Sequence, residues 1–524
     1  MPYNEDPLDD RFARECDILE WEKDIEDPDD LPNIERSLRL NFNQKPICEQ
    51  VEPEPAVNKE EPETTSDEPE IDFFNEKNNQ IDGLKLMQYI GKLGIAKVVD
   101  GEDTSYVYIN NCLVETISTD RLHDIVMKSL EGKEEIQSAL HDQINKHFAR
   151  KSLLSIPAKT ITTLRDDKDK AYLPFKNGLL VITKDGHELE EYQDLDMLIW
   201  KHQVVDRNWR KEKGGDFERF IKNTSSYLEG GQYQLNQPEY EKKLNTIGYL
   251  LHTYKDPAES KCVILTDAIL DDYNTGQVNG QRGKSSIFCE ALNRMRNLLS
   301  YDGKLISVGG DKFAFQNIKP DYQLILFDDV SKGFKFENLF HMITGNMTVE
   351  GKNRTKFSIP FSKAPKLVIT TNYPFKGDGE SYLGRQHIVE FSDFYSTKNK
   401  PIDVHGKRFF DDWNDTEWAC FDTFMAGCLQ KYLNTGKLNS SRSRNYELKK
   451  LDNPEFILFA KTLSLNVPLD RKKLLLSFQN EYSEKITRNQ FYDLLRQYSY
   501  AMDYECIENK IKQRQCITLV QKIQ

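Results

Sequence analysis

Two short apolar runs, each leading into side chains that bind ions, constrain the fold of this chain more than any other feature. Residues 324–327 are all apolar and lead into Asp328, while residues 367–369 lead through two threonines to Asn372. Apolar runs of this length with polar residues after them are typical of buried strands. Lys284, on a glycine-rich turn, lies 44 residues before Asp328, which lies 44 residues before Asn372. We therefore expect a lysine, a carboxylate and an amide to converge at the ends of neighbouring strands.

Length and composition limit the class of protein. A chain of 524 residues exceeds what one hydrophobic core supports, and typical domain sizes predict about three or four domains. No apolar run reaches the roughly 18 residues of a membrane span, and the N-terminus lacks the basic and apolar segments of a secretory signal. The nine cysteines include no Cys-x-x-Cys pair, which indicates reduced cytoplasmic thiols rather than a zinc site or a disulfide framework.

The acidic charge of the chain is concentrated at its N-terminus. Residues 1–70 hold 23 Asp and Glu against 7 Lys and Arg, a net of −16 that exceeds the −14 of the whole chain. Charge and proline with few large apolar residues are typical of disorder, so residues 1–78 are predicted to form a disordered acidic tail. Its apolar patch, from Phe12 to Ile25, predicts either a short helix that folds onto a partner such as a replication protein, or a solvated linker. An acidic pI that belongs to a tail does not exclude nucleic acid as a partner.

Hydrophobic periodicity divides the rest of the chain into three regions. Residues 79–235 are predicted to form an α+β domain, and residues 436–524 a C-terminal domain of helices followed by strand-like segments, both compatible with a winged helix. Residues 236–435 alternate strands with helices, which predicts an α/β domain with a mainly parallel sheet. A helix is expected from Lys284, and strands are expected at residues 262–265, 304–308, 323–328 and 366–371.

The turn before that helix has the composition of a phosphate-binding loop. Glycines let backbone N–H groups turn toward phosphates, and the helix N-terminus behind them favours negative charge. Lys284 would contact the β- and γ-phosphates, and the Ser285 hydroxyl would bind Mg²⁺. The spacing departs from the standard pattern, whose first glycine would fall at Val278. The residues predicted to bind the nucleotide are Asn279, Gly280, Gly283, Lys284, Ser285 and Ser286.

The polar residues after the two apolar runs supply the remaining parts of a nucleotide triphosphatase. Asp328 is predicted to hold Mg²⁺ with Ser285, and Asp329 to polarise the water that attacks the γ-phosphate. Asn372 is predicted to bind that water or the γ-phosphate from the neighbouring strand. Each cluster alone is common at turns and strand ends, and the interpretation depends on finding all three in this order. ATP and Mg²⁺ are the expected cofactors.

This series of motifs resembles the superfamily 3 helicases, and within them the poxvirus-type primase-helicases of viruses, phages and plasmids. The resemblance is strong over residues 240–430 and weaker over residues 80–240, and no primase domain is recognisable. It implies an AAA+-like P-loop ATPase core and a ring, usually a hexamer, with ATP bound between subunits. Arg385 matches the region that supplies an arginine finger to the neighbouring subunit. The segments that carry the resemblance are residues 279–285, 313–315, 327–330, 343–353 and 365–374.

A basic hairpin tip is the expected contact with DNA. Residues 347–349 and 357–359 read as two strands, and the cations between them are Lys352, Arg354 and Lys356. Three cations at a tip suit the phosphates of single-stranded DNA in a central channel, without sequence preference. The alternative is a solvated charged turn.

The sequence thus predicts an ATP-dependent replicative DNA helicase of a virus or mobile element, which translocates on single-stranded DNA as a homo-oligomeric ring. Its expected location is the cytoplasm, that of the host for a viral protein. Two alternatives stay open: a DNA packaging or partition ATPase, and an NTP-driven regulatory switch without unwinding activity. Translocation polarity, subunit number, host, the tail's partner and cooperation with a separate primase do not follow from the sequence.

Overall fold

The computed structural model describes residues 69–100, 103–195, 197–268, 282–306, 308–352, 356–377, 379–482, 485–511 and 513–521. Most of the predicted acidic tail, residues 1–68, therefore lies outside the described residues. The short strand β1 (Phe74–Asn75) falls within the remainder of that segment, and Phe73 beside it is buried. No helix among the described residues is long and apolar enough to cross a membrane.

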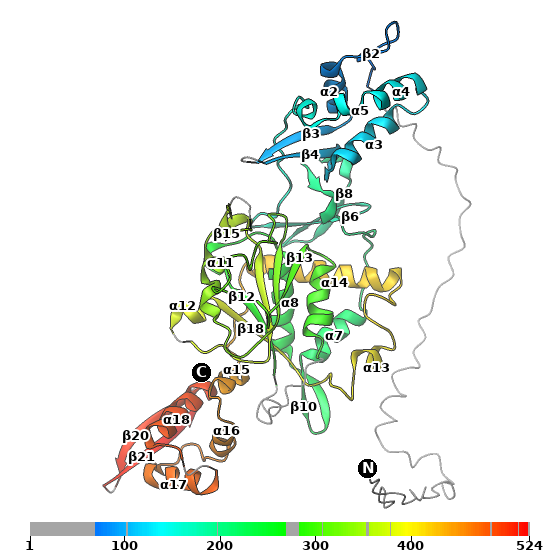
Figure 1. Cartoon of the computed structure of the whole chain (residues 1–524). Coiled ribbons are helices and arrows are strands. Elements are labelled where there is room, and N and C mark those ends of the chain that lie inside the picture. Colours follow the sequence, from blue (N-terminus) through cyan, green and yellow to red (C-terminus); the bar gives the residue numbers. More distant parts are fainter. Residues whose placement is uncertain are drawn as a thin grey trace, which may run out of the picture. The chain divides into compact units, whose positions relative to one another are not determined.

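The first region of the described chain combines helices with small sheets (Figure 1). Asp82 caps its first helix by accepting hydrogen bonds from the N–H groups of Leu84 and Lys85 at 3.0 and 3.2 Å. The helices are α2 (Gly83–Lys92), α3 (Thr119–Ser129), α4 (Glu134–Asp142), α5 (Ile144–His147) and α6 (Arg150–Leu153). The strands are β2 (Gln80–Ile81), β3 (Ile95–Asp100), β4 (Asp103–Asn110), β5 (Leu113–Ile117), β6 (Lys170–Phe175), β7 (Gly178–Thr183), β8 (His187–Glu190) and β9 (Ile199–Trp200).

A five-stranded parallel sheet forms the centre of the structure. Its spatial order is β13-β14-β17-β12-β18, so the first strand in sequence stands between the fourth and the fifth. The prediction of a mixed α/β fold with a parallel sheet is confirmed. The strands are β12 (Cys262–Asp267), β13 (Leu298–Asp302), β14 (Leu324–Val330), β17 (Lys366–Thr371) and β18 (Gln386–Phe391).

Two strands differ from the sequence prediction. The strand expected at residues 304–308 is wrong: β13 ends at Asp302, and the following segment turns so that Leu305 is 82% exposed. The apolar residues of that segment led to the prediction of a strand. The actual strand, β13, is an edge strand that mixes polar and apolar residues, so its pattern is a weaker signal. β18 was not predicted, because its buried residues include Gln386 and His387.

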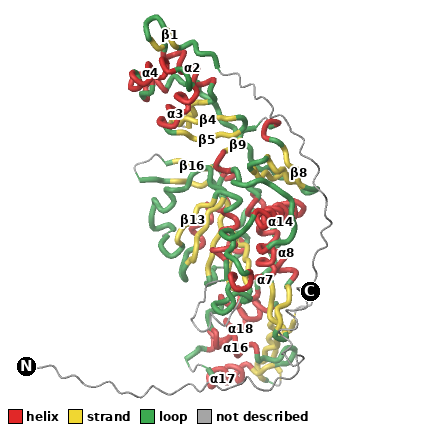
Figure 2. Tube along the Cα trace, turned by 90° about the vertical axis from the view of Figure 1, so that its right-hand side faces the viewer, coloured by secondary structure: helices red, strands yellow, loops and turns green. Residues whose placement is uncertain are grey.

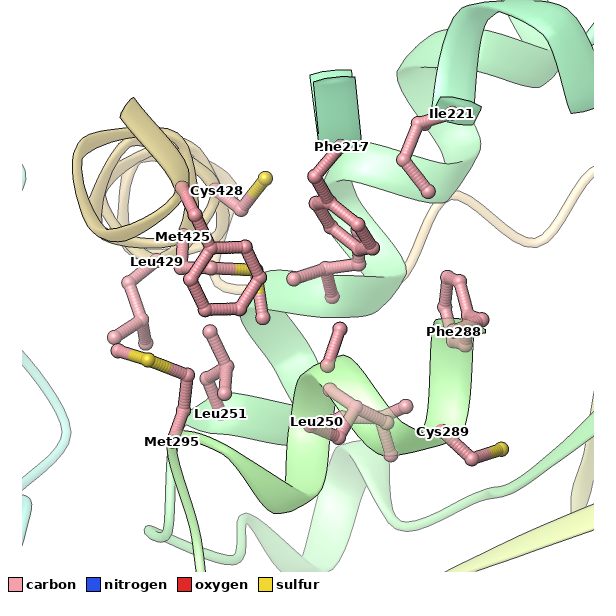
Figure 3. Close-up of a cluster of buried hydrophobic side chains, with 14 of the residues drawn as sticks. Phe217, Ile221, Leu250, Leu251, Phe288, Cys289, Met295, Met425, Cys428 and Leu429 are labelled. Carbon is pink, nitrogen blue, oxygen red and sulfur yellow. The ribbon is translucent and has the colours of Figure 1, made fainter. Parts of the chain in front are cut away.

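Side chains of the sheet alternate between two cores, as strand geometry requires. Val263 and Leu265 of β12 join one core, whereas Cys262 and Ile264 join the other. Figures 1 and 2 show helices on one side of the sheet, and Figure 3 shows apolar side chains of these helices packed together. They are α7 (Asp216–Thr224), α8 (Gln237–Leu251) and α14 (Asp415–Thr435). The same core includes α10 (Glu290–Asn293). The second core includes α11 (Phe340–Thr344), α12 (Glu380–Leu383), β15 (Met347–Val349) and β16 (Phe357–Ile359).

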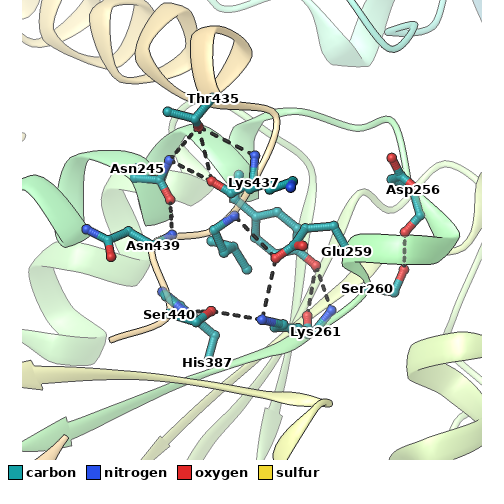
Figure 4. Close-up of polar contacts among 12 residues, drawn as sticks. Asn245, Asp256, Glu259, Ser260, Lys261, His387, Thr435, Lys437, Asn439 and Ser440 are labelled. Carbon is teal, nitrogen blue, oxygen red and sulfur yellow. Dashed lines mark hydrogen bonds and ion pairs between the residues drawn. The ribbon is translucent and has the colours of Figure 1, made fainter. Parts of the chain in front are cut away.

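A polar network fastens the segment after α14 to α8 (Figure 4). Asn245 donates to the Thr435 hydroxyl and to the Lys437 carbonyl, both at 3.1 Å, and accepts from the Asn439 N–H at 2.8 Å. Lys261, just before β12, donates to the Ser440 hydroxyl at 2.8 Å. These hydrogen bonds hold the chain against α8 and the start of β12 as it leaves α14.

The C-terminal region has its own apolar core, centred on Phe456, Phe478 and Phe491. A capping box precedes its longest helix, since the side chains of Thr487 and Gln490 each bond to the backbone N–H of the other residue. The helices are α13 (Pro401–His405), which precedes α14, then α15 (Arg444–Lys450), α16 (Pro454–Lys461), α17 (Arg471–Glu481) and α18 (Arg488–Met502). The strands are β19 (Leu469–Asp470), β20 (Tyr504–Ile511) and β21 (Arg514–Gln521), which pair antiparallel.

One further hairpin, β10 (Ser226–Glu229) and β11 (Gln232–Leu235), belongs to the segment before α8. The predicted domain boundaries and winged helices stay predictions.

Candidate active site

The carboxyl ends of three adjacent strands, β12, β14 and β17, meet at one edge of the sheet. The register aligns Leu265 with Thr370 and Phe327 with Ile369, so the residues that follow lie side by side. The chain also reverses its direction of winding here, because β13 lies to one side of β12 and β18 to the other. Clefts at such points are where open α/β sheets bind ligands.

A glycine in the left-handed region precedes the helix that carries Lys284. Gly283 has φ of 79°, and a Cβ atom there would lie 2.7 Å from the Phe220 ring of α7. The following turn is a π-helix, η4 (Lys284–Cys289), in which the Phe288 N–H bonds to the Gly283 carbonyl at 2.9 Å. Glycine is therefore required at this position, and single π-turns of this kind are frequent at functional sites.

Lys284 is held between two residues that end strands. Its ammonium forms an ion pair with the Asp267 carboxylate at the end of β12 and donates to Asn372 Oδ1 at 2.9 Å. Lys284 and Asp267 are each only 9% exposed. Burial lowers the pKa of Lys284, and the Asp267 carboxylate opposes that shift. The two most widely separated motifs of the sequence thus contact each other directly.

Asp328 joins the same edge through hydroxyl groups. Its Oδ1 accepts hydrogen bonds from the Ser285 hydroxyl and from the Thr370 hydroxyl, the latter at 2.5 Å. The pairing of β14 with β17 is interrupted here by a bulge, and Asp329 within it has φ of 54°. Thr370 Oγ1 accepts from the Asp329 N–H at 2.7 Å, which satisfies a donor that the bulge removes from the ladder.

Asp329 faces a different partner from Asp328. Its carboxylate pairs with Lys304, and both side chains are more than half exposed. An exposed pair of this kind contributes little to stability. Because the Asp329 carboxylate is exposed, it is accessible to water and to a ligand. Asp329 lies near Lys284, but the residue that its carboxylate pairs with is Lys304.

Three residues that the sequence analysis did not assign complete the cluster. Arg282 Nε lies 3.6 Å from Asp267 Oδ1, and Lys449 of α15 donates to the Asp267 carbonyl. Lys449 is almost fully buried, and burial lowers its pKa to about 8. Asp267 ends an apolar run just as Asp328 does, so the same pattern would have found it, whereas the approach of Lys449 depends on tertiary structure.

The other predicted site residues fall in three groups. Ser286 is exposed on the first turn of η4, and Asn279 and Gly280 lie outside the described residues. Arg385 precedes β18 and its carbonyl accepts from the Cys262 N–H at 2.9 Å, so it stands at the opposite edge of the sheet from Lys284. Its guanidinium donates to the Ser381 carbonyl at 2.6 Å and lies 4.7 Å from the Phe340 ring.

The predicted DNA-binding cations lie at the β15–β16 hairpin. Lys352 and Lys356 are exposed on either side of the tip, and Arg354 lies outside the described residues. Strands β15 and β16 pair antiparallel as expected, with Val349 opposite Phe357. The hairpin itself is confirmed, and its contact with DNA stays a prediction.

The donor atoms of the site fit a magnesium–nucleotide complex. Mg²⁺ is usually held by one or two protein oxygens together with phosphate oxygens and water, and the adjacent Ser285 and Asp328 oxygens meet that need. Among the described residues no group of three or more His, Cys, Asp or Glu is arranged to hold a metal by itself. Gly283, Lys284 and the helix behind them fit the phosphates.

Comparison with protein-family models gave no match, and neither did comparison with curated proteins. Among solved structures, the chain is similar to the A-form apo C-terminal region of NrS-1, at 12% identity and a TM-score of 0.37, over 84% of this chain and 100% of that one. It is also similar to JCV helicase bound to a substituted acetamide, at 11% identity and a TM-score of 0.22, over 55% of this chain and 65% of that one. TM-scores this low do not establish a function. The functional proposal is therefore based on the geometry of this chain.

Proposed function

We propose that the chain binds and hydrolyses ATP at the edge formed by β12, β14 and β17. The observation that carries this proposal is the convergence of Lys284, Asn372 and the Ser285–Asp328 pair from three separate parts of the sequence. Buried lysine beside a glycine-initiated helix suits phosphate, and paired hydroxyl and carboxylate oxygens suit a divalent cation. We also propose that the domain around this sheet is an AAA+-like P-loop ATPase core.

Each residue has a distinct task in this proposal. Lys284 binds the β- and γ-phosphates, while Ser285 and Asp328 hold Mg²⁺, which neutralises charge on the phosphate oxygens when bound. Asp329 and Asn372 orient the attacking water at the γ-phosphate. Asp329 is exposed enough to exchange Lys304 for that water, and Asn372 already lies within hydrogen-bond distance of Lys284.

We further propose that the chain is a superfamily 3 DNA helicase that acts as a ring on single-stranded DNA. The exposed Lys352 and Lys356 on a hairpin support a sequence-independent contact with phosphates. The position of Arg385, at the opposite edge from Lys284, supports a role toward a neighbouring subunit rather than toward its own site. Winged-helix flanks belong to the same proposal.

Nucleotide hydrolysis with and without DNA, together with strand displacement on a forked duplex, tests the function. We expect hydrolysis to require Lys284 and to rise with single-stranded DNA, and we expect Lys284→Ala to abolish turnover while the chain stays folded. Lys335→Ala, which removes an exposed lysine outside the site, is the matched control. Robust hydrolysis by Lys284→Ala would refute the site. Stimulation by DNA without strand displacement would favour a packaging or partition ATPase, and hydrolysis indifferent to DNA would favour a regulatory switch.

A further inference from the structure

The C-terminal region holds a concave surface that the proposed nucleotide site does not use. It encloses about 730 Å³ between the first turns of α17 and α18 and the start of β21. Ten residues line it, of which five are cationic and one, Asp470, is acidic. The cations are Arg471, Lys472, Lys473, Arg488 and Arg514. So high a local excess of positive charge indicates an anionic ligand.

Two of these cations are fixed in place by their neighbours. The Arg471 guanidinium lies 4.1 Å from the centre of the Tyr492 ring and pairs with Glu508 at 2.5 Å, and the Tyr492 hydroxyl donates to the Arg471 carbonyl at 2.7 Å. Arg514 lies 3.8 Å from the Asp470 carboxylate. Arg471 and Tyr492 thus form the floor of the concave surface, and the carboxylates of Glu508 and Asp470 balance the charges of Arg471 and Arg514.

The other three cations face solvent. Lys472, Lys473 and Arg488 are exposed, and among the described residues none has a carboxylate within 4.0 Å. Arg488 donates to the Gln515 amide oxygen at 3.4 Å, and its guanidinium lies 5.9 Å from the centre of the Tyr492 ring. Their charges come from two helices and are spread around the rim, so an extended chain of anionic groups fits them better than one small anion does. Leu476, 46% exposed beside them, adds apolar surface of the kind that sugars and bases contact.

We propose that this concave surface binds the phosphodiester backbone of DNA, as a second nucleic-acid site independent of the β15–β16 hairpin and of nucleotide hydrolysis. Lys472, Lys473 and Arg488 contact successive phosphates, while Arg471 and Tyr492 form the floor beneath them. The site recognises charge and backbone rather than sequence, because its polar groups are cationic side chains that match phosphate oxygens.

Fluorescence anisotropy with labelled single-stranded and duplex DNA, across a salt series, tests this site in the full chain. The triple variant Lys472→Ala, Lys473→Ala and Arg488→Ala should weaken binding at least tenfold near 0.1 M salt. It should also reduce the slope of log K against log salt by about 2 to 3, since each lost phosphate contact removes about 0.7 to 0.9. Because the three side chains are exposed, the fold should persist, and Lys472→Arg with Lys473→Arg should retain wild-type affinity.

Several outcomes discriminate this site from other sources of affinity. Lys461→Ala with Lys485→Ala removes two exposed lysines of the same region that do not line the concave surface, and should leave affinity unchanged. A loss confined to duplex or to single-stranded DNA would identify the form of DNA bound. Unchanged affinity and slope in the triple variant, or an equal loss in the control, would overturn the proposal. Lys284→Ala should bind DNA here as the wild type does, so failure of the ATPase proposal leaves this one intact.

Discussion

Replacing Asp267 with asparagine separates the contribution of this carboxylate to stability from its effect on nucleotide binding. Asp267 and Lys284 form a buried ion pair, and Arg282 adds a second cation 3.6 Å from the same carboxylate. A triphosphate would bring its own negative charge to Lys284. We therefore expect the Asp267 carboxylate to compete with nucleotide, so that the substitution weakens the free protein and strengthens its binding of nucleotide.

The burial of the pair sets the size of both effects. Removing one partner of a buried ion pair costs about 3 to 5 kcal/mol, and the lower end applies because asparagine still offers Lys284 an acceptor oxygen. The cost falls on the nucleotide-free protein, where the cations lose their counter-charge. A gain of about 1.4 to 2.7 kcal/mol in binding is expected to follow, which corresponds to roughly 10- to 100-fold in affinity.

Calorimetric titration with a non-hydrolysable ATP analogue and Mg²⁺ measures the affinity, and urea unfolding without nucleotide measures the stability. Asp206→Asn is the matched control, because Asp206 pairs with Lys176 on the surface and should affect neither quantity. Weaker nucleotide binding with unchanged stability would refute the reasoning, since it would mean that Asp267 acts on the ligand rather than against it.

Three other substitutions probe separate elements. Lys352→Ala with Lys356→Ala should lower the affinity for single-stranded DNA, measured by anisotropy, and should reduce the slope of log K against log salt by about 1.4, or about 0.7 for each lost phosphate contact; an unchanged slope would exclude the hairpin as a phosphate contact. Arg385→Ala should preserve nucleotide binding but lower turnover by about 10³-fold or more, and should inhibit wild-type subunits when mixed with them; full activity would remove Arg385 as the arginine finger. Lys243 is buried, and burial lowers its pKa to about 7. The unfolded chain therefore binds a proton that the folded chain lacks between about pH 7 and 10, so stability should rise with pH there by up to about 1.4 kcal/mol per unit, and Lys243→Met should flatten that rise in urea titrations at several pH values.

The residues whose position at a strand end was predicted correctly share one property: they end or follow strongly apolar strands. β14 and β17 are buried almost throughout, so their boundaries, and with them Asp328 and Asn372, could be read from composition. The helix start at Lys284 followed from its glycine. Parallel pairing then brought these groups to one edge without further information from the sequence.

The elements that were missed depend on tertiary partners. β18 contains buried polar side chains, which are unusual in the sheet of an α/β domain unless other parts of the chain supply hydrogen-bond partners. His387 lies 2.8 Å from the Thr246 hydroxyl of α8, and Glu390 accepts from the Ser443 hydroxyl and the Tyr446 N–H before and within α15. A local pattern cannot supply such partners, because they come from more than 50 residues away.

Charge placement at the site explains why the missed residue Asp267 matters most. Lys284, Arg282 and Lys449 gather around the end of β12, and each is at least nine-tenths buried. On β14, which β17 separates from β12, the Asp328 carboxylate accepts hydrogen bonds from the hydroxyls of Ser285 and Thr370. A nucleotide would place its phosphates on the first group and its metal on the second. Without a nucleotide, three buried cations would be costly, and Asp267 supplies the counter-charge that lets this part of the protein fold.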